Sequence, residues 1–282
     1  LENYFSDDIA KKMFEKIEII QGDFEVEKLG LSDDCYNALT EKITTVIHCG
    51  ANVKHYGKYD KFYKSNVLGT TNLIEFCKKS KAKLAHISTV SVGGFSKITF
   101  PKILDEEHIN VGQSFNSHVY MITKYQAECK VLKAIENNEI DGKIFRLGNI
   151  MPRITDMKFQ INSKDNAFFS RVKTILKYRE LTLDYMQIDI DISPVDLCAK
   201  SILKILKNNN CKTIYHIYNN NTFTIENLLN TLNISINVVD SEELINKLRT
   251  SSDPLDAHLL NDLNNRAYME TPTTCELTKN WL

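Results

Sequence analysis

The sequence lacks three features that mark specialised classes of protein: an excess of charge of one sign, a long apolar run, and a stretch rich in glycine or proline. Its 282 residues carry 35 Lys and Arg against 36 Asp and Glu, a formal net charge of −1. Binding to a phosphate backbone needs a one-sided basic surface, so we expect no nucleic-acid partner. No apolar run approaches the roughly 20 residues that span a bilayer, so we expect no membrane partner. The N-terminal Leu1–Phe5 also lacks the basic-then-apolar pattern of a signal peptide.

The seven cysteines lack the spacing of a disulfide framework or a zinc site. No Cys-x-x-Cys pair occurs and the number is odd, which favours reduced, mostly buried thiols in a cytoplasmic protein. His48, Cys49 and His55 lie close together in the sequence, but their spacing is not that of metal ligands on a helix. We therefore predict no metal site.

Short apolar segments alternate with amphipathic ones, a pattern that predicts an α/β fold with a doubly wound parallel sheet. The expected strands are Lys16–Ile20, Thr45–Cys49, Lys83–Ser88, Lys143–Leu147 and Ile214–Tyr218. The expected helices are 66–80, 117–137 and 166–177, one that opens at Ser193–Asp196, and one that runs to Leu248 after a capping box at Asp240 and Glu243. We expect a sheet domain over residues 1–150, joined by about 187–206. Residues 151–186 and 207–282 should form a smaller mixed α/β C-terminal lobe.

Tyr120 and Lys124 are four residues apart on a predicted helix, so both side chains project from the same face. An ammonium beside a phenol lowers the pKa of the tyrosine from about 10. Such a tyrosine can deliver a proton to a carbonyl oxygen near neutral pH. By itself Tyr-x-x-x-Lys is a weak signal, because an exposed pair on a helix gives the same pattern.

The strand that precedes this helix ends at Ser88-Thr89. In doubly wound sheets, ligands bind at the carboxyl ends of the strands. A hydroxyl group there, followed by a helix that carries Tyr and Lys, is the geometry that carbonyl reduction requires, because hydroxyl and phenol both bind the oxygen as it gains negative charge. This context makes Thr89, Tyr120 and Lys124 candidates for the catalytic residues of a carbonyl reduction.

These segments, in this order, resemble the extended short-chain dehydrogenases. The residues that carry the resemblance are Ile47–Ala51, Asn66–Thr70, Ser88-Thr89, Tyr120-x-x-x-Lys124 and Arg146–Asn149. More narrowly, the sequence is similar to the terminal thioester reductase domains of nonribosomal peptide synthetases, which are related to carboxylic acid reductases and fatty acyl reductases. The supporting segments are Gly22–Phe24, Leu29–Ser32, His48–Val53, Phe159-Gln160, Asn166–Phe168 and Ser193–Asp196. The resemblance runs from Leu1 to about Val195 and is loose beyond that point.

The resemblance implies a Rossmann-like sheet, a substrate-binding C-terminal lobe, and NADPH (or NADH) as cofactor. Tyr120 would donate the proton, and Lys124 would lower the pKa of Tyr120 and hold the nicotinamide ribose. Thr89 would bind the carbonyl oxygen of the substrate. The other cofactor-binding residues would be Asp23 and Phe24 at the adenine, Cys49, Gly50 and Ala51 through their backbone, Asn66 on the proton-relay side, and Gly148 and Asn149 beside the nicotinamide. Simpler alternatives are a turn after Gly22 for Asp23 and a helix N-cap for Asn66.

The implied substrate is an acyl or peptidyl thioester on the phosphopantetheine arm of a carrier protein. Hydride attack would give a hemithioacetal that collapses to an aldehyde and a free thiol, and a second hydride would give the alcohol. Two other functions stay open. One is a sugar-nucleotide epimerase or dehydratase on the same scaffold, and the other is a non-catalytic module that only docks carrier or synthetase domains.

The family binds the cofactor pyrophosphate with a glycine-rich turn at a helix N-terminus. This sequence has no Gly-x-x-Gly-x-x-Gly, and its only adjacent glycines, Gly93-Gly94, follow the Thr89 strand. We therefore expect a Rossmann-like sheet without its first βαβ unit, either as a fragment of a longer reductase or as a natural degenerate form. The chain alone should bind dinucleotide poorly, and its sheet edge should be exposed unless another segment covers it.

Overall fold

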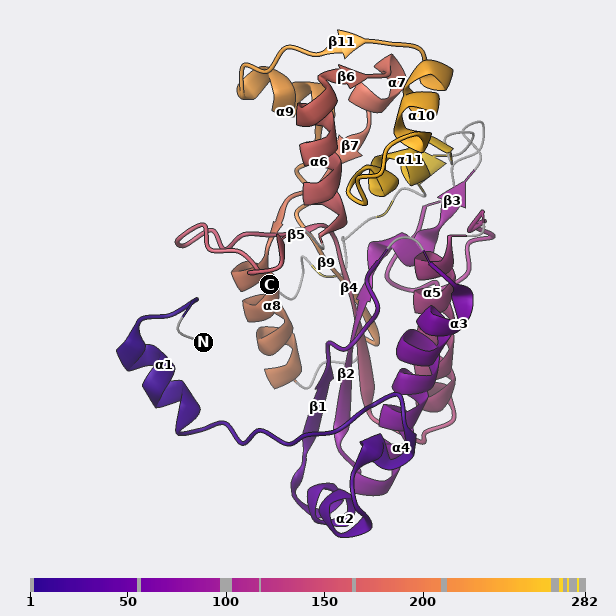
Figure 1. Ribbon diagram of the computed structural model, residues 1–282. Helices are drawn as coiled ribbons and strands as arrows, with labels where there is room; N and C mark the ends of the chain where they lie inside the picture. The colour runs from indigo at the N-terminus through magenta and orange to yellow at the C-terminus, as the bar shows by residue number, and fades with distance from the viewer. Residues whose placement is uncertain are drawn as a thin grey trace.

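Four parallel strands form the central sheet, in the order β1-β2-β4-β9 (Figure 1). They are β1 (Thr45–His48), β2 (Lys83–Thr89), β4 (Gly142–Leu147) and β9 (Ile214–Ile217). The computed structural model describes residues 3–54, 57–96, 103–116, 118–163, 166–208, 212–264, 269–270, 273 and 278. The predicted α/β fold with a parallel sheet is confirmed.

Helices lie on both faces of this sheet, and the alternation of side chains along each strand supplies a core to each face. On one face Leu84, Ile144 and Ile214 pack with α2 (Asp33–Lys42), α4 (Gly69–Ser80) and α5 (Val119–Glu136). On the other face the next residues of the same strands, Ala85, Phe145 and Tyr215, pack with α8 (Val195–Lys207). In Figure 1, α8 accordingly lies on the opposite side of the strands from α4 and α5.

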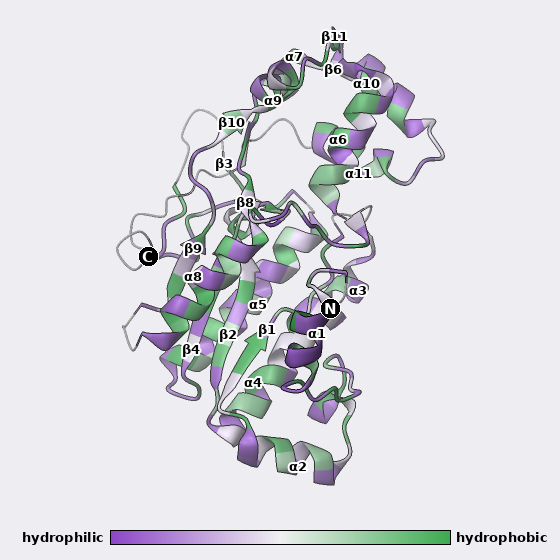
Figure 2. Ribbon diagram, turned by 90° about the vertical axis from the view of Figure 1, so that its left-hand side faces the viewer, coloured by the Kyte–Doolittle hydropathy of each residue, from purple (hydrophilic) through white to green (hydrophobic). Residues whose placement is uncertain are grey.

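A second hydrophobic core lies outside the sheet, among residues between Met151 and Leu263. Its helices are α6 (Ala167–Tyr178), α7 (Leu183–Met186), α9 (Ile225–Thr231), α10 (Ser241–Arg249) and α11 (Asp256–Asn264). Figure 1 shows these helices above the carboxyl ends of the sheet strands, and Figure 2 shows the mixed colouring of α10 and α8 that helices with one buried side have. The predicted boundaries of the C-terminal lobe stay a prediction.

The remaining elements are short. The helices are α1 (Asp7–Phe14), α3 (Tyr59–Phe62), the 3-10 turns Glu27–Gly30 and Val90–Gly93, and the π-helix Tyr63–Leu68. Paired two-residue strands are β5 (Ile150–Met151) with β8 (Ser193–Pro194), β6 (Glu180–Leu181) with β11 (Asn237–Val238), β7 (Asp189–Ile190) with β10 (Phe223–Thr224), and β3 (Phe95–Ser96) with β12 (Met269–Glu270). None of the helices in the described ranges has the length and apolar character that crossing a membrane requires.

Two local predictions were wrong. Lys16–Ile20 forms no strand; it is irregular, and Ile17 and Ile19 are 45% and 82% exposed. An extended segment becomes a strand only when a neighbour accepts its hydrogen bonds, and no described strand lies beside this one. At the start of α10, Asp240 accepts a bond from the Glu242 amide, 2.8 Å away, in place of the predicted box with Glu243.

The two edges of the sheet differ. On the outer edge of β9, the buried carboxylate of Glu106 accepts a hydrogen bond from the His216 amide over 3.0 Å and another from the Thr278 amide over 2.9 Å. On the other edge, β1 pairs within the described residues only with β2, and Ile47 is 45% exposed. Among the described residues, β1 therefore has one edge without a partner strand, and on β9 the His216 amide is hydrogen-bonded to Glu106.

Candidate active site

The carboxyl end of β2 places a buried hydroxyl group at the end of the sheet from which ligands approach. Thr89 is the last residue of β2, and its Oγ1 accepts a hydrogen bond from the Ser91 amide over 3.1 Å. This bond begins the 3-10 turn that carries the chain out of the sheet. Thr89 therefore has a fixed position, as a residue that binds a substrate oxygen needs.

Helix α5 brings Tyr120 to Thr89, as predicted from the sequence. The two side chains are hydrogen-bonded, and the bond from the Thr89 hydroxyl lowers the pKa of Tyr120. Burial has the larger effect, because it disfavours the phenolate, and it raises the pKa of Tyr120 to about 12. The predicted lowering of this pKa by Lys124 is therefore not observed.

The lowering is absent because the ammonium group of Lys124 makes its hydrogen bond with another group. Nζ donates to the carbonyl oxygen of Ile87 in β2 over 2.8 Å. The side chain is buried, which lowers the pKa of Lys124 to about 8, while the nearby Glu128 raises it. Glu128 already forms a fully buried ion pair with Arg146, so Lys124 adds a buried positive charge without a carboxylate of its own.

Asn66 connects the loop after β1 to the helix that carries the tyrosine. Its side-chain oxygen accepts a hydrogen bond from the Asn52 amide over 2.7 Å, and its Nδ2 donates to Thr123 Oγ1 over 3.0 Å. Asn66 is buried in the π-helix Tyr63–Leu68, so it is not the N-cap considered from the sequence. Single π-helical turns are frequent at functional sites.

Two buried histidines, His48 and His86, lie next to the hydrogen bonds of Asn66. His48 Nε2 is 3.0 Å from Thr70 Oγ1, and that hydroxyl donates to the Asn66 carbonyl over 2.6 Å. Since the hydroxyl proton is used, Nε2 of His48 is the donor. Burial lowers the pKa of His48 to about 4 and that of His86 well below its usual value, with Lys124 adding to both shifts.

The expected adenine residues occupy a turn before the sheet. Asp23 is exposed, and its Oδ1 accepts a hydrogen bond from the Glu25 amide over 2.9 Å, so it does close a turn after Gly22. The ring of Phe24 lies against two glycines. A Cβ atom at Gly50 would be 2.9 Å from this ring, and one at Gly69 would be 2.3 Å from it.

Gly50 and Ala51, half-buried, and Cys49, exposed, follow β1 directly. Gly148 and Asn149 follow β4 in the same way, and Thr89 pairs across the ladder with Leu147, the residue before Gly148. The turns after β1 and β4 therefore begin on either side of the end of β2. The structure thus brings Thr89, Tyr120 and Lys124 together, and the turn before the sheet places the ring of Phe24 against Gly50 while Asp23 stays exposed.

The sequence assigned no role in this region to His86, or to Asp191, whose Oδ2 accepts a hydrogen bond from the Asn149 amide over 2.9 Å. His48 belonged to the segments that carry the resemblance, but its only suggested role, as a metal ligand, was rejected on spacing. No described group of three or more His, Cys, Asp or Glu side chains could hold a metal ion, and His55 lies outside the described residues. The five described cysteines are all free thiols: Cys77 and Cys198 are buried, Cys35 and Cys129 are half-buried, and Cys49 is exposed.

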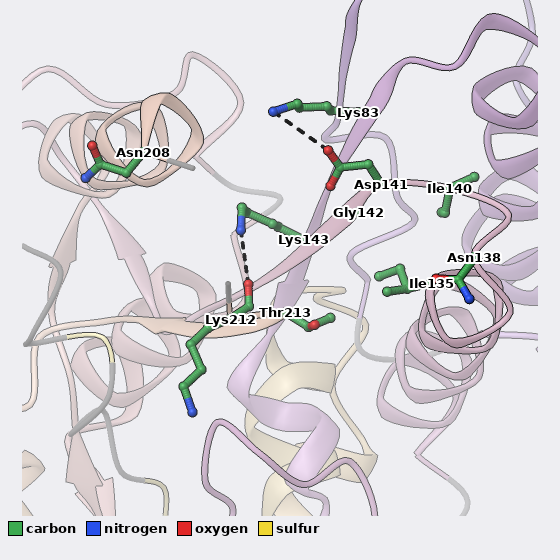
Figure 3. A pocket seen from close by; sticks show the side chains of 10 residues that line it. All are labelled: Lys83, Ile135, Asn138, Ile140, Asp141, Gly142, Lys143, Asn208, Lys212 and Thr213. Carbon is green, nitrogen blue, oxygen red and sulfur yellow. Dashed lines mark hydrogen bonds and ion pairs between the residues drawn. The ribbon is translucent and has the colours of Figure 1, made fainter. Parts of the chain in front are cut away.

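A polar hollow of about 560 Å³ lies at the opposite end of the sheet (Figure 3). It is lined by Lys83, the first residue of β2, and by Gly142, the first residue of β4. Its lysines are engaged with protein groups: Lys83 is 3.7 Å from Asp141, and Lys143 donates to the Lys212 carbonyl over 3.1 Å. Because ligands of parallel sheets bind at the carboxyl ends of the strands, this hollow is not the candidate site.

Comparison with known proteins agrees with this geometry. The family model named NAD_binding_4, described as male sterility protein, matches residues 1–202. The chain belongs to this NAD-binding family. Among solved structures, a thiolation-reductase di-domain from an archaeal non-ribosomal peptide synthetase has a TM-score of 0.81 and 28% identity, covering 100% of this chain and 60% of its own. The reductase domain of the aureusimine biosynthetic cluster has a TM-score of 0.79 and 29% identity, covering 98% and 70%.

Curated relatives include a carboxylic acid reductase of Segniliparus rugosus, which is 24% identical over 70% of this chain and 17% of its own length. The chain spans 8%, 17% and 4% of the length of three such relatives, each a larger synthase, reductase or synthetase. The resemblance to thioester reductase domains that the sequence indicated is confirmed, and so is the Rossmann-like fold.

The described residues fit the nicotinamide and ribose end of the cofactor that this family implies. Thr89, Tyr120 and Lys124 provide two hydroxyl groups and an ammonium group at the carboxyl end of β2. One ammonium hydrogen is used by the Ile87 carbonyl, and an ammonium group has three.

Proposed function

We propose that this chain carries the hydride-transfer centre of an NADPH-dependent thioester reductase, which releases an acyl or peptidyl chain from a carrier protein as an aldehyde or alcohol. The observation that carries the proposal is the meeting of Thr89 and Tyr120 over the buried Lys124 at the carboxyl end of β2. The family membership and the likeness to solved reductase domains support it.

In this mechanism Thr89 and Tyr120 bind the carbonyl oxygen of the thioester. When bound, the nicotinamide cofactor would supply the hydride that the carbonyl carbon accepts. As the oxygen gains negative charge, Tyr120 donates its proton, and the hydroxyl of Thr89 donates a hydrogen bond. Collapse of the resulting hemithioacetal breaks the carbon–sulfur bond, which gives an aldehyde and the thiol of the phosphopantetheine arm.

Lys124 has two roles in the proposal. Its ammonium group would hold the ribose of the cofactor, and its positive charge would favour the phenolate of Tyr120. In the structure this ammonium is directed to Ile87, and the pKa of Tyr120 is high. The second role therefore requires the ammonium group of Lys124 to act on Tyr120 more strongly than it does in this structure.

Asp23 and Phe24 would border the adenine, and the backbone of Cys49, Gly50 and Ala51 would line the cofactor. Asn66 would hold the proton-relay side, through its bonds to Asn52 and Thr123. The C-terminal helices would bind the acyl chain, and the carrier protein would be the partner.

The test uses the protein with every residue that its gene encodes. It is given NADPH with an acyl-pantetheine thioester, and separately with nucleotide sugars. We expect oxidation of NADPH, release of free thiol and a trapped aldehyde or alcohol with the thioester only. Turnover of nucleotide sugars alone would support the epimerase or dehydratase alternative. Turnover of neither substrate, with retained binding to carrier protein, would support the docking module.

A further inference from the structure

The carboxylate of Asp191 binds the turn that follows β4. Oδ2 accepts a hydrogen bond from the Asn149 amide over 2.9 Å, and Oδ1 accepts one from the side-chain Nδ2 of Asn149 over 2.8 Å. The Ser193 hydroxyl also donates to Oδ2, over 2.7 Å. A carboxylate that accepts three hydrogen bonds makes strong, charge-assisted contacts and has a defined position.

The same carboxylate explains why residue 148 is a glycine. A Cβ atom at Gly148 would lie 2.1 Å from Oδ2 of Asp191 and 2.7 Å from Cβ of Tyr218. The Ser193 hydroxyl in turn accepts a hydrogen bond from the Asn219 amide over 3.0 Å. Asp191 therefore joins the turns that follow β4 and β9 to the segment between β7 and β8.

This position is next to the proposed catalytic hydroxyl. Thr89 is the ladder partner of Leu147, so the chain that leaves β4 at Gly148 starts beside Thr89. The amide group of Asn149 is also oriented by Asp191, because its NH₂ is directed to Oδ1. A change at Asp191 thus alters the wall of the site without removing any group that touches the reacting atoms.

We propose that Asp191 is a positioning residue, which holds the Gly148-Asn149 turn in the conformation against which the nicotinamide end of the cofactor rests. The inference rests on the proposed function, since it assigns this turn to the cofactor site. Asp191 acts through Asn149 and Gly148. It makes its contribution from the segment that connects β7 and β8, so the cofactor site depends on residues beyond the sheet.

The experiment compares Asp191→Asn with Asp189→Asn, a matched loss of charge at an exposed position of β7. For Asp191→Asn we expect kcat/KM for NADPH to fall about 10- to 100-fold, as small misplacements at reacting sites do, with KM raised. Asp189→Asn should stay within about twofold of the unchanged protein. Equal values for the two variants would overturn the inference.

A swapped pair separates positioning from general loss of structure. In Asp191→Asn combined with Asn149→Asp, the amide and carboxylate exchange places, and the new side chain at position 191 keeps an oxygen for the backbone amide of position 149 and for the Ser193 hydroxyl. We expect the double variant to recover most of the lost NADPH affinity, and no recovery would contradict the inference. Affinity is measured by fluorescence titration, so it is read even if the unchanged protein reduces no thioester. That last result would refute the proposed function and leave the affinity comparison to decide on Asp191.

Discussion

Replacing Arg146 by methionine removes one half of the most deeply buried ion pair in the described structure. Arg146 in β4 and Glu128 in α5 are both 0% exposed, and Nη2 lies 2.9 Å from Oε2. Nη1 also donates to the carbonyl oxygens of Asp105 and His108, over 3.0 and 3.1 Å. The variant therefore leaves a buried carboxylate without its counter-charge and two carbonyl groups without their donor.

The expected loss follows from this burial. Removing one partner of a buried ion pair costs about 3–5 kcal/mol, because the Glu128 carboxylate stays buried and keeps only the weaker attraction of Lys124, which forms no ion pair with it among the described contacts. The unpaired carbonyl groups move the loss toward the upper end of that range. Since single domains are stable by about 5–15 kcal/mol, the variant should retain only part of its free energy of unfolding.

Urea unfolding of the variant and of two controls measures this loss. Lys78→Met breaks two partly exposed ion pairs, with Glu139 and with Glu75, and it should cost far less because solvent screens such pairs. Arg146→Met combined with Glu128→Leu should recover most of the loss, because an apolar pair of similar volume often replaces a buried ion pair at no cost. The reasoning is refuted if Arg146→Met costs no more than Lys78→Met.

Three further predictions concern the site. Gly148→Ala should lose about 1–3 kcal/mol of unfolding free energy and weaken NADPH binding, because its Cβ would meet Asp191; unchanged unfolding and titration curves would speak against this. In the folded protein the pKa of Lys124 is about 8, whereas an unperturbed lysine has a pKa of 10.5. Between pH 8 and 10.5 the unfolded chain therefore binds a proton that the folded protein has lost. Stability should therefore rise by roughly 3 kcal/mol from pH 8 to 10.5, and Lys124→Met should lack this rise in urea unfolding. In the folded protein the pKa of His48 is about 4, below the ordinary value of 6.5, so the stability that its neutral form contributes is lost as pH falls from 6.5 to 4. His48→Gln should therefore make the free energy of unfolding depend less on pH in this range. An identical acid unfolding profile would contradict the assignment.

The parallel sheet could be predicted because its strands are marked locally. The strands of the sheet are short apolar runs with a local end signal: β2 ends at the polar residue Thr89, and β4 ends just before Gly148. The same signal failed for Lys16–Ile20, because pairing depends on a neighbouring strand and not on the segment alone. Helix α5 was predicted within two residues at its start, since its apolar positions recur with helical spacing.

The site was predicted only where one helix or one strand end defines it. Tyr120 and Lys124 share a helix face, and Thr89 ends the preceding strand, so their positions follow from local pattern and the carboxyl-end rule. The direction in which the pKa of Tyr120 shifts was predicted wrongly, because it depends mainly on how deeply the phenol is buried, which helical spacing does not reveal. Asp191 reaches the site across forty-two positions of sequence, and no spacing indicates such a contact.

The central claim is that Tyr120 is the proton donor of a thioester reductase, and Tyr120→Phe tests it most directly. The control is Tyr125→Phe on the same helix, a half-buried tyrosine that packs against Phe115 with ring centroids 5.1 Å apart. The account predicts that Tyr120→Phe lowers the rate of NADPH-dependent thioester reduction by about 100- to 10,000-fold, with NADPH affinity retained, while Tyr125→Phe keeps most of the activity. A Tyr120→Phe variant that reduces the thioester as fast as Tyr125→Phe would contradict the account.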